Sequence, residues 1–159
     1  LMLSVGAGVG AWDAMVVLCL ISRGISVVDA NALVESSDPM CGPFWQGPPQ
    51  ANWREVIRFD ADTHLRKSVD AAVLKIEYPC YEASWPAEAL KLFEGRYIVY
   101  VGEPMGNANA TDEFFYLLGL AQSEDVEPLF KILEEHALPQ IDDKRSAAQT
   151  TLYICGRLK

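Results

Sequence analysis

The sequence lacks the residue patterns that mark several common classes of protein. Its four cysteines are widely spaced and form no Cys-x-x-Cys pair, which excludes the usual ligand spacing of a zinc site. Its two histidines, His64 and His136, have no Ser or Cys partner at a spacing typical of a nucleophilic site, so we expect structural or exposed roles for them. The longest unbroken apolar run, residues 14–21, is far shorter than the roughly 20 residues of a membrane-spanning helix. We therefore expect no metal site and no transmembrane segment.

Basic residues are also scarce. The chain has 13 Lys and Arg residues against 22 Asp and Glu residues, which gives a net charge of −9. Because nucleic-acid phosphates are bound mainly by Lys and Arg, and because the basic residues form no patch, we expect no nucleic-acid partner. With 50% apolar and 22% charged residues, the composition is typical of a soluble globular protein. The cysteines favour free thiols and an intracellular compartment, cytoplasmic or organellar.

Strand-like and helix-like segments alternate along the chain, whose 159 residues predict one domain over residues 1–159. The strands are expected at residues 1–5, 25–28, 55–59, 71–76, 96–101, 137–141 and 150–154, and the helices at residues 12–22, 86–95, 111–118 and 126–136. Strands separated by helices predict a parallel sheet, and the last two strands resemble a hairpin. The pattern predicts an α/β fold, a Rossmann-like, doubly wound, seven-stranded sheet that is mostly parallel. We expect the first strand to be central, the C-terminal strand to be antiparallel, and an upstream segment to be missing before Leu1.

The turn between the first strand and the first helix is rich in glycine. Glycine allows a sharp turn and lets a ligand approach the backbone closely, and the amides at the start of the next helix can face that ligand. An acidic residue ending the second strand can accept hydrogen bonds from ribose hydroxyls, and one after the third strand could meet an adenine amino group. The residues expected to bind a nucleoside cofactor are Gly6, Ala7, Gly8, Gly10, Asp29, Asp60 and Ala61. A tight turn kept for packing and a dinucleotide fingerprint are the alternatives.

A second group of candidates follows the fourth and fifth strands. The segment Tyr78-Pro79-Cys80-Tyr81 comes at the end of the fourth strand, and Glu103 follows the fifth. The carboxyl ends of parallel strands are where ligands bind in open α/β sheets. Tyr78, Pro79, Tyr81 and Glu103 are therefore the candidates for catalytic roles. The alternatives are a proline-stiffened loop with aromatic packing and a solvated loop carboxylate.

Together these segments resemble the S-adenosylmethionine-dependent class I methyltransferase-like proteins, in particular a poorly characterised group within them. That group has Gly-Ala-Gly-x-Gly-x-Trp after the first strand, as at residues 6–12, and a Trp-Pro-Pro-Tyr segment, which corresponds to residues 78–81. An Asp-x-Phe-Phe helix matches residues 112–115. The resemblance covers nearly the whole chain and implies a Rossmann-like fold with S-adenosylmethionine as cofactor.

The chain departs from that pattern around the expected ligand site. Ser4 stands where the group usually has an acidic residue that helps to anchor the methionine amino group. Tyr78 and Cys80 replace the Trp and the second Pro of the Trp-Pro-Pro-Tyr segment, and residues 105–111 replace a glycine-rich turn. In the Asn-Pro-Pro-Tyr type of amino-methyltransferase motif, the first residue and the proline carbonyl hold a substrate amino group. The changes therefore affect both the cofactor side and the acceptor side.

Two functions follow from the resemblance and its departures. The first is a degenerate methyltransferase-like domain that serves as a structural or accessory subunit and binds protein partners. The alternative is an active S-adenosylmethionine-dependent methyltransferase on a small-molecule or protein acceptor, because methyl transfer depends mainly on alignment of the reacting atoms. A nicotinamide-binding oxidoreductase is a third reading of the glycine-rich turn.

Overall fold

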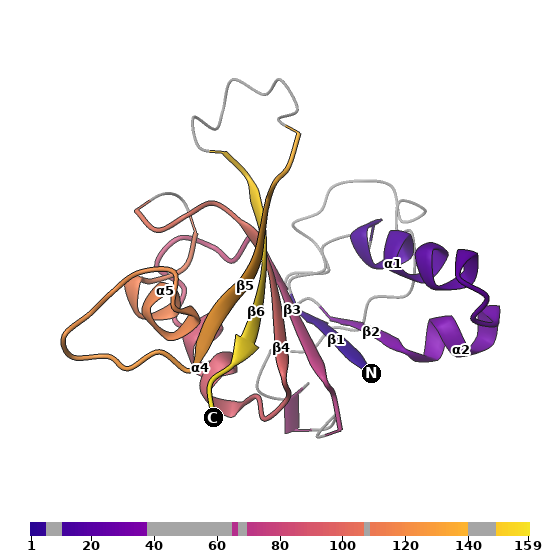
Figure 1. The fold of residues 1–159 in the computed structure, drawn as a ribbon, viewed down its shortest axis with the longest axis horizontal. Coiled ribbons are helices and arrows are strands. Elements are labelled where there is room, and N and C mark those ends of the chain that lie inside the picture. The colour runs from indigo at the N-terminus through magenta and orange to yellow at the C-terminus, as the bar shows by residue number, and fades with distance from the viewer. Residues whose placement is uncertain (6–10, 38–64, 67–69, 107–108, 140–148) are drawn as a thin grey trace, which may run out of the picture.

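The computed structural model describes residues 1–5, 11–37, 65–66, 70–106, 109–139 and 149–159. They form an α/β fold around one mostly parallel sheet of six described strands, in the order β2-β1-β3-β4-β6-β5 (Figure 1). The strands are β1 (Met2–Val5), β2 (Val34–Ser37), β3 (Val73–Glu77), β4 (Tyr97–Gly102), β5 (Phe130–Ala137) and β6 (Thr151–Arg157). The helices with described bounds are α1 (Ala11–Ser22), α2 (Val27–Ala32), α4 (Trp85–Leu92) and α5 (Asp112–Leu118).

The first strand lies inside the sheet. β1 pairs in parallel with β2 on one side and with β3 on the other, and β3 pairs in parallel with β4. β6 is antiparallel to both β4 and β5. In the described order β1 lies inside the sheet, next to the terminal strand β2, so the expectation of a central first strand is confirmed only in that β1 is not at an edge. The expected antiparallel C-terminal strand is confirmed. The strand expected at residues 55–59 lies outside the described residues.

The helices lie on both faces of the sheet. The chain moves from β1 to β2 in one direction along the sheet and from β3 to β4 in the other, so right-handed crossovers place the intervening helices on opposite faces. Figure 1 shows α1 and α2 on one side of the sheet and α4 and α5 on the other. The larger core is on the α4–α5 side, where Leu74, Ile76 and Ile98 of the strands belong to one buried cluster with Leu90 and Phe114 of the helices.

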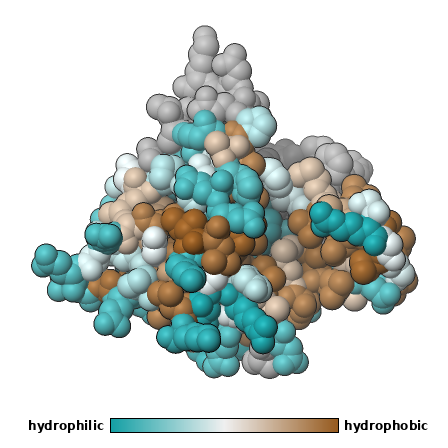
Figure 2. Space-filling model, viewed as in Figure 1, coloured by the Kyte–Doolittle hydropathy of each residue, from teal (hydrophilic) through white to brown (hydrophobic). Residues whose placement is uncertain are grey.

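Among the described residues, the core on the α1–α2 side is much smaller. Its buried apolar residues are Val17, Ala30 and Val34. Because α1 is apolar on nearly every side, the sequence predicts its burial against the sheet, but Leu18 on α1 is 63% exposed and Val28 on α2 is 78% exposed. Apolar residues gather over these two helices in Figure 2. We call the exposed apolar side chains of this region the α1–α2 surface: Trp12, Met15, Leu18, Ile25, Val27, Val28 and Leu33.

The second strand does not lie at residues 25–28, and that expectation is wrong. The β-branched residues there suggest a strand, but residues 27–32 form α2, and the strand β2 begins only at Val34. The reason is a helix cap. The hydroxyl of Ser26 accepts a hydrogen bond from the backbone N–H of Asp29 at 3.1 Å, which satisfies one of the free amides at the helix start. Asp29 therefore lies in the first turn of a helix and not at the end of a strand.

The helix expected at residues 126–136 is also wrong. Residues 130–137 form β5, which pairs with β6 along its length, and the strand expected at residues 137–141 accordingly lies earlier in the chain. The Leu, Glu and Lys residues of this segment favour a helix locally, but cross-strand pairing overrides that weak preference. The pairing register shifts at a bulge between Ile132 and Glu134. The expected hairpin-like end of the chain is present as the antiparallel pair β5–β6.

The remaining described elements agree with the sequence expectations apart from small shifts at their ends. Pro86 lies in the first turn of α4, where it costs no intrahelical hydrogen bond. Gly119 ends α5 with a left-handed φ of 74°, the conformation that glycine adopts most easily. No helix in the described ranges combines the length and the apolar character that a membrane crossing requires.

Candidate functional site

A buried group of charged and hydroxyl side chains lies toward the carboxyl ends of β1 and β3. Lys75 of β3 is only 3% exposed, and its Nζ donates to Oδ1 of Asp13 at 2.9 Å. The same Nζ forms an ion pair with Oε2 of Glu77 at 2.8 Å. It also lies 3.4 Å from Oγ of Ser4 on β1. We call Ser4, Asp13, Lys75 and Glu77 the buried ion cluster.

Three elements bring the buried ion cluster together. β1 and β3 pair in a register that sets Ser4 beside Lys75, and paired residues of parallel strands point to the same face of a sheet. Glu77 lies two residues after Lys75 on the same strand, so it shares that face. Asp13 comes from the first turn of α1, where the positive end of the helix dipole favours a carboxylate.

The cluster leaves hydrogen-bonding capacity unused. Oδ2 of Asp13 and Oγ of Ser36 are buried and have no hydrogen-bond partner among the described residues. Ser36 of β2 pairs with Ser4, so a polar row of Ser36, Ser4 and Lys75 crosses three strands on the α1 side. Buried carboxylates are costly unless a cation or several donors compensate them. The arrangement suits a positively charged hydrogen-bond donor, and Lys75 supplies that group.

Asn109 connects the two loops that follow β3 and β4. Its Oδ1 accepts a hydrogen bond from the backbone N–H of Glu103 at 2.7 Å, and its Nδ2 donates to the carbonyl of Pro79 at 3.1 Å. The hydroxyl of Tyr100 donates to the carbonyl of Glu103 at 2.7 Å and lies 3.3 Å from Oδ1 of Asn109. The two loops are therefore held side by side at the carboxyl edge of the sheet, which places the four candidates for catalytic roles near one another.

Those four candidates differ in accessibility. Tyr78 is 48% exposed, with its hydroxyl 3.3 Å from Oγ1 of Thr150, and Tyr81 is 65% exposed. Pro79 and Glu103 are buried. Tyr78 also has a φ of 38°, a left-handed value that is unfavourable for a bulky residue and that marks local backbone strain. Only the two tyrosines present side chains that a ligand could contact.

The expected nucleoside-binding residues are not brought together in the described part of the structure. Gly6, Ala7, Gly8, Gly10, Asp60 and Ala61 lie outside the described residues. Asp29 is described, and its carboxylate accepts a hydrogen bond from the Ser26 hydroxyl at 2.6 Å in the first turn of α2. The ribose-binding role was inferred from a position at the end of a strand, and Asp29 does not occupy such a position.

Reasoning from the sequence missed Asp13, Lys75, Glu77 and Asn109. A signal was present for Lys75 and Glu77, because charged residues at alternate positions of an apolar run in a central strand need buried partners. Asp13 gives the same signal at the start of an apolar helix. Asn109 gives none, since its partners are backbone groups and a tyrosine hydroxyl that only the fold brings within reach.

Burial shifts the pKa values of two groups on the opposite face of β4 and β6. Burial, with the nearby Tyr153 and Glu103, raises the pKa of the Tyr100 hydroxyl well above its ordinary value. Burial raises the pKa of the Cys155 thiol to about 12. Both groups therefore stay protonated near neutral pH and supply neither a general base nor a nucleophile. Cys19, Cys80 and Cys155 are free thiols, as expected.

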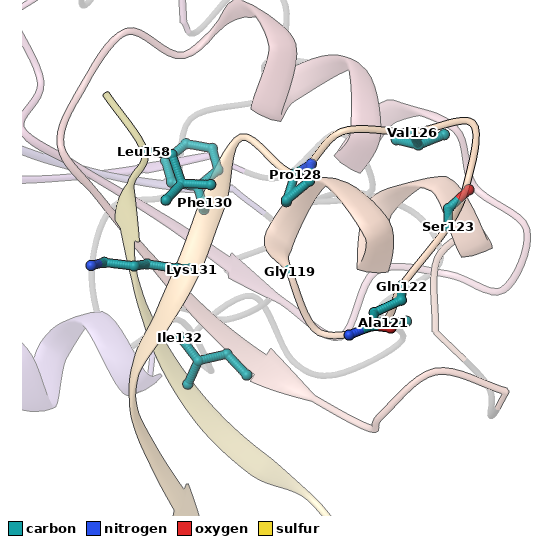
Figure 3. A pocket seen from close by; sticks show the side chains of 10 residues that line it. All are labelled: Gly119, Ala121, Gln122, Ser123, Val126, Pro128, Phe130, Lys131, Ile132 and Leu158. Carbon is teal, nitrogen blue, oxygen red and sulfur yellow. The ribbon is translucent and has the colours of Figure 1, made fainter.

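A pocket of about 410 Å³ lies at the other end of the sheet (Figure 3). It is formed by the end of α5, the connection to β5, the first residues of β5 and Leu158. Phe130, which lines the pocket, pairs with Arg157 of β6. The residue before Arg157, Gly156, pairs with Tyr97 at the start of β4, so the pocket lies at the amino end of β4 and far from the carboxyl edge. Lys131 points away from the other lining side chains in Figure 3. The pocket is therefore separate from the buried ion cluster.

The carboxyl edge of β1 and β3 is the candidate site because of its chemistry. Within the part of the chain that the structure describes, no group of three or more His, Cys, Asp and Glu residues is placed to hold a metal ion. The chain matches no protein-family model and no curated protein. The assignment of a function to this edge therefore depends on the contacts of its own residues.

Proposed function

We propose that this chain is a degenerate methyltransferase-like domain that serves as a structural or accessory subunit of a larger assembly. The proposal depends on one observation, the position of the Lys75 ammonium, which is buried between Asp13 and Glu77 and beside Ser4. In this proposal, side chains of the protein itself already bind the acidic and carbonyl groups that a cofactor and a methyl acceptor would contact.

The topology supports the fold that the proposal requires. Parallel strands followed by an antiparallel pair at the end of the chain are the pattern of the seven-stranded methyltransferase sheet, and the six described strands have that form. Helices on both faces agree with a doubly wound, Rossmann-like arrangement (Figure 1). The seventh strand of the proposal is the one expected at residues 55–59.

The cofactor side of the proposal follows from the buried ion cluster. The resemblance assigns the methionine ammonium of S-adenosylmethionine to the acidic residue that Ser4 replaces. A buried ammonium already lies 3.4 Å from the Ser4 hydroxyl and pairs with both nearby carboxylates. A second ammonium there would meet a like charge at low dielectric, which is strongly unfavourable. We therefore expect binding of S-adenosylmethionine to be weak or absent.

The acceptor side of the proposal follows from Asn109. In the amino-methyltransferase motif the proline carbonyl holds a substrate amino group. Here the carbonyl of Pro79 accepts one hydrogen bond from Nδ2 of Asn109 at 3.1 Å and a second from the backbone N–H of Ala110 at 3.3 Å. The Ala110 N–H is shared with the carbonyl of Cys80 at 3.1 Å, so it satisfies the second lone pair of the Pro79 carbonyl only in part. Asn109 thus takes the place at this carbonyl that a substrate amino group would need.

A role in an assembly is supported by the α1–α2 surface. Single exposed apolar residues are normal, but contiguous apolar patches on a protein surface usually mark sites of interaction. The two helices contact each other and leave Leu18 and Val28 largely exposed, which favours a protein partner on this side. The alternative, an active methyltransferase, is favoured by the exposure of Tyr78 and Tyr81 beside the carboxyl edge, where an acceptor could contact them.

The test is a calorimetric titration of the purified protein with S-adenosylmethionine and with S-adenosylhomocysteine. We expect no binding tighter than about 1 mM, which corresponds to a standard free energy of about −4 kcal/mol. Asp29→Ala serves as a control and should leave the titration unchanged, because the Asp29 carboxylate accepts a hydrogen bond from the Ser26 cap in the first turn of α2. Micromolar binding together with methyl transfer to a protein or small molecule would establish the active enzyme instead.

A further inference from the structure

The surroundings of Lys75 Nζ have the geometry of an ammonium-binding site. Three oxygen atoms approach the nitrogen, at 2.9 Å from Asp13, 2.8 Å from Glu77 and 3.4 Å from Ser4. They come from three separate elements, α1, β3 and β1. A primary ammonium has three N–H donors, which matches the three acceptors in number.

The charge of the site also requires a cation. The Asp13 side chain is 0% exposed and the Glu77 side chain 5% exposed. Two buried carboxylates that both contact the Lys75 ammonium repel each other and lose their hydration, so removal of that cation is expected to destabilise the fold. The ammonium of Lys75 removes both penalties at once.

We propose that Asp13, Glu77 and Ser4 form a binding site for primary alkylammonium groups, and that Lys75 occupies this site as a ligand tethered to β3. The proposal depends only on the contacts of these four residues and not on a methyltransferase ancestry. The wild-type protein then takes up no free amine at this position. A chain with a shortened Lys75 side chain binds one, because the three acceptors remain in place on the sheet and on α1.

The experiment compares thermal unfolding of Lys75→Ala with and without n-propylammonium chloride. This amine has the atoms that the substitution removes. We expect the variant to melt roughly 10 °C below the wild-type protein, because one partner of a buried ion pair is lost. Saturating n-propylammonium should raise its melting temperature by about 5 °C, as expected for a ligand that binds the folded state alone. Tetramethylammonium at the same concentration, which has the charge but no N–H donor, should have no such effect.

Two matched variants separate site binding from general salt effects. Lys91 also contacts two carboxylates, Glu88 at 2.9 Å and Glu113 at 3.0 Å, but its side chain is 41% exposed. Lys91→Ala should melt within about 2 °C of the wild-type protein and show no response to the amine. Lys75→Met fills the space with an apolar chain and should also show no response.

The experiment tests the proposal whether Lys75→Ala is folded or unfolded in buffer. If it is unfolded, recovery of the native circular dichroism in n-propylammonium, and not in tetramethylammonium, supports the site. An equal response of the wild-type protein, of Lys91→Ala or to tetramethylammonium overturns it, and so does the absence of any response or recovery in Lys75→Ala. Because no titration with S-adenosylmethionine is involved, this result is independent of the calorimetric test of the proposed function.

Discussion

Lys75 and Asn109 each connect segments that are distant in the sequence, and both do so below the surface. Lys75 is 62 residues from Asp13, and Asn109 is 30 residues from Pro79. Such buried polar contacts contribute little net free energy when complete, but they are costly when one partner is removed. At the level of single residues, they determine how the ends of the parallel strands are arranged.

Asn109→Ala should lower the free energy of unfolding by about 2–3 kcal/mol. The substitution leaves the backbone N–H of Glu103 and one lone pair of the Pro79 carbonyl without their partner in a buried place. Urea unfolding followed by tryptophan fluorescence measures the change. Asn31→Ala is the matched control, because Asn31 is exposed and its one side-chain hydrogen bond is to a carbonyl of its own helix. Equal effects of the two substitutions would contradict a bridging role for Asn109.

The buried thiol of Cys155 should make the stability depend on pH in the alkaline range. Its pKa is raised from 9.0 to about 12 by burial, so the unfolded chain ionises first as the pH rises. The stabilisation is present below pH 9 and is lost toward pH 12, with a slope of at most about 1.4 kcal/mol per pH unit. Urea unfolding of the wild-type protein and of Cys155→Ala at pH 8 and pH 10.5 should give a difference that shrinks with pH. A constant difference would show that the thiol is not buried as described.

At the level of the elements, the sequence was most informative where local and tertiary preferences agree. The apolar runs that became β3 and β4 and the glycine that ends α5 were predicted because pattern and packing favour the same structure there. At residues 25–28 the β-branched residues indicate a strand, but the Ser26 cap favours a helix start. At β5 the residues favour a helix locally, and the pairing with β6 that makes a strand is not visible from local sequence. The site was predictable only as an edge of the sheet. The side chains that build it depend on the register between distant strands.

The cap of α2 can be tested directly. Ser26→Ala removes the hydroxyl that accepts from the Asp29 N–H and donates to the Asp29 carboxylate, so the stability should fall by about 1 kcal/mol. Ser22→Ala in the last turn of α1 is the control, since its hydroxyl donates to the carbonyl of Cys19 at an exposed position, and its effect should stay below about 0.5 kcal/mol. Both values come from urea unfolding. If Ser26→Ala leaves the free energy of unfolding unchanged, the result would favour a strand at residues 25–28, as the sequence suggests, over the capped helix α2.

For the molecule as a whole, the two faces of the sheet are unequal. The α4–α5 face contains most of the buried apolar side chains, including the ring cluster of Tyr100, Phe114 and Phe115, whereas the described core under α1 and α2 consists of Val17, Ala30 and Val34. Burial of apolar surface is the main stabilising contribution in folding. From the packing of the described residues, we therefore expect the two faces to differ in local stability.

Hydrogen exchange should detect this inequality. We expect backbone amides of α1 and α2 to open with a free energy at least about 2 kcal/mol lower than amides of β3 and β4, because few buried apolar residues in the described part of the chain pack against the two helices. Exchange of the native protein followed by mass spectrometry of peptides resolves the two regions. If peptides from α1 are protected as strongly as those from β4, the α1–α2 surface is covered in solution, and self-association should then be measured by sedimentation.

The exposed strand β5 has a consequence for behaviour at high concentration. Seven of its eight residues, from Lys131 to Ala137, are exposed. Of the six described strands, none pairs with the outer side of β5, so its backbone groups there could pair with a strand of another molecule. The bulge at Ile132 and Glu134 interrupts the regular spacing of those groups, and the carboxylates of Glu134 and Glu135 would face like charges in a second copy. We therefore expect this edge to resist strand-to-strand polymerisation when the protein is concentrated.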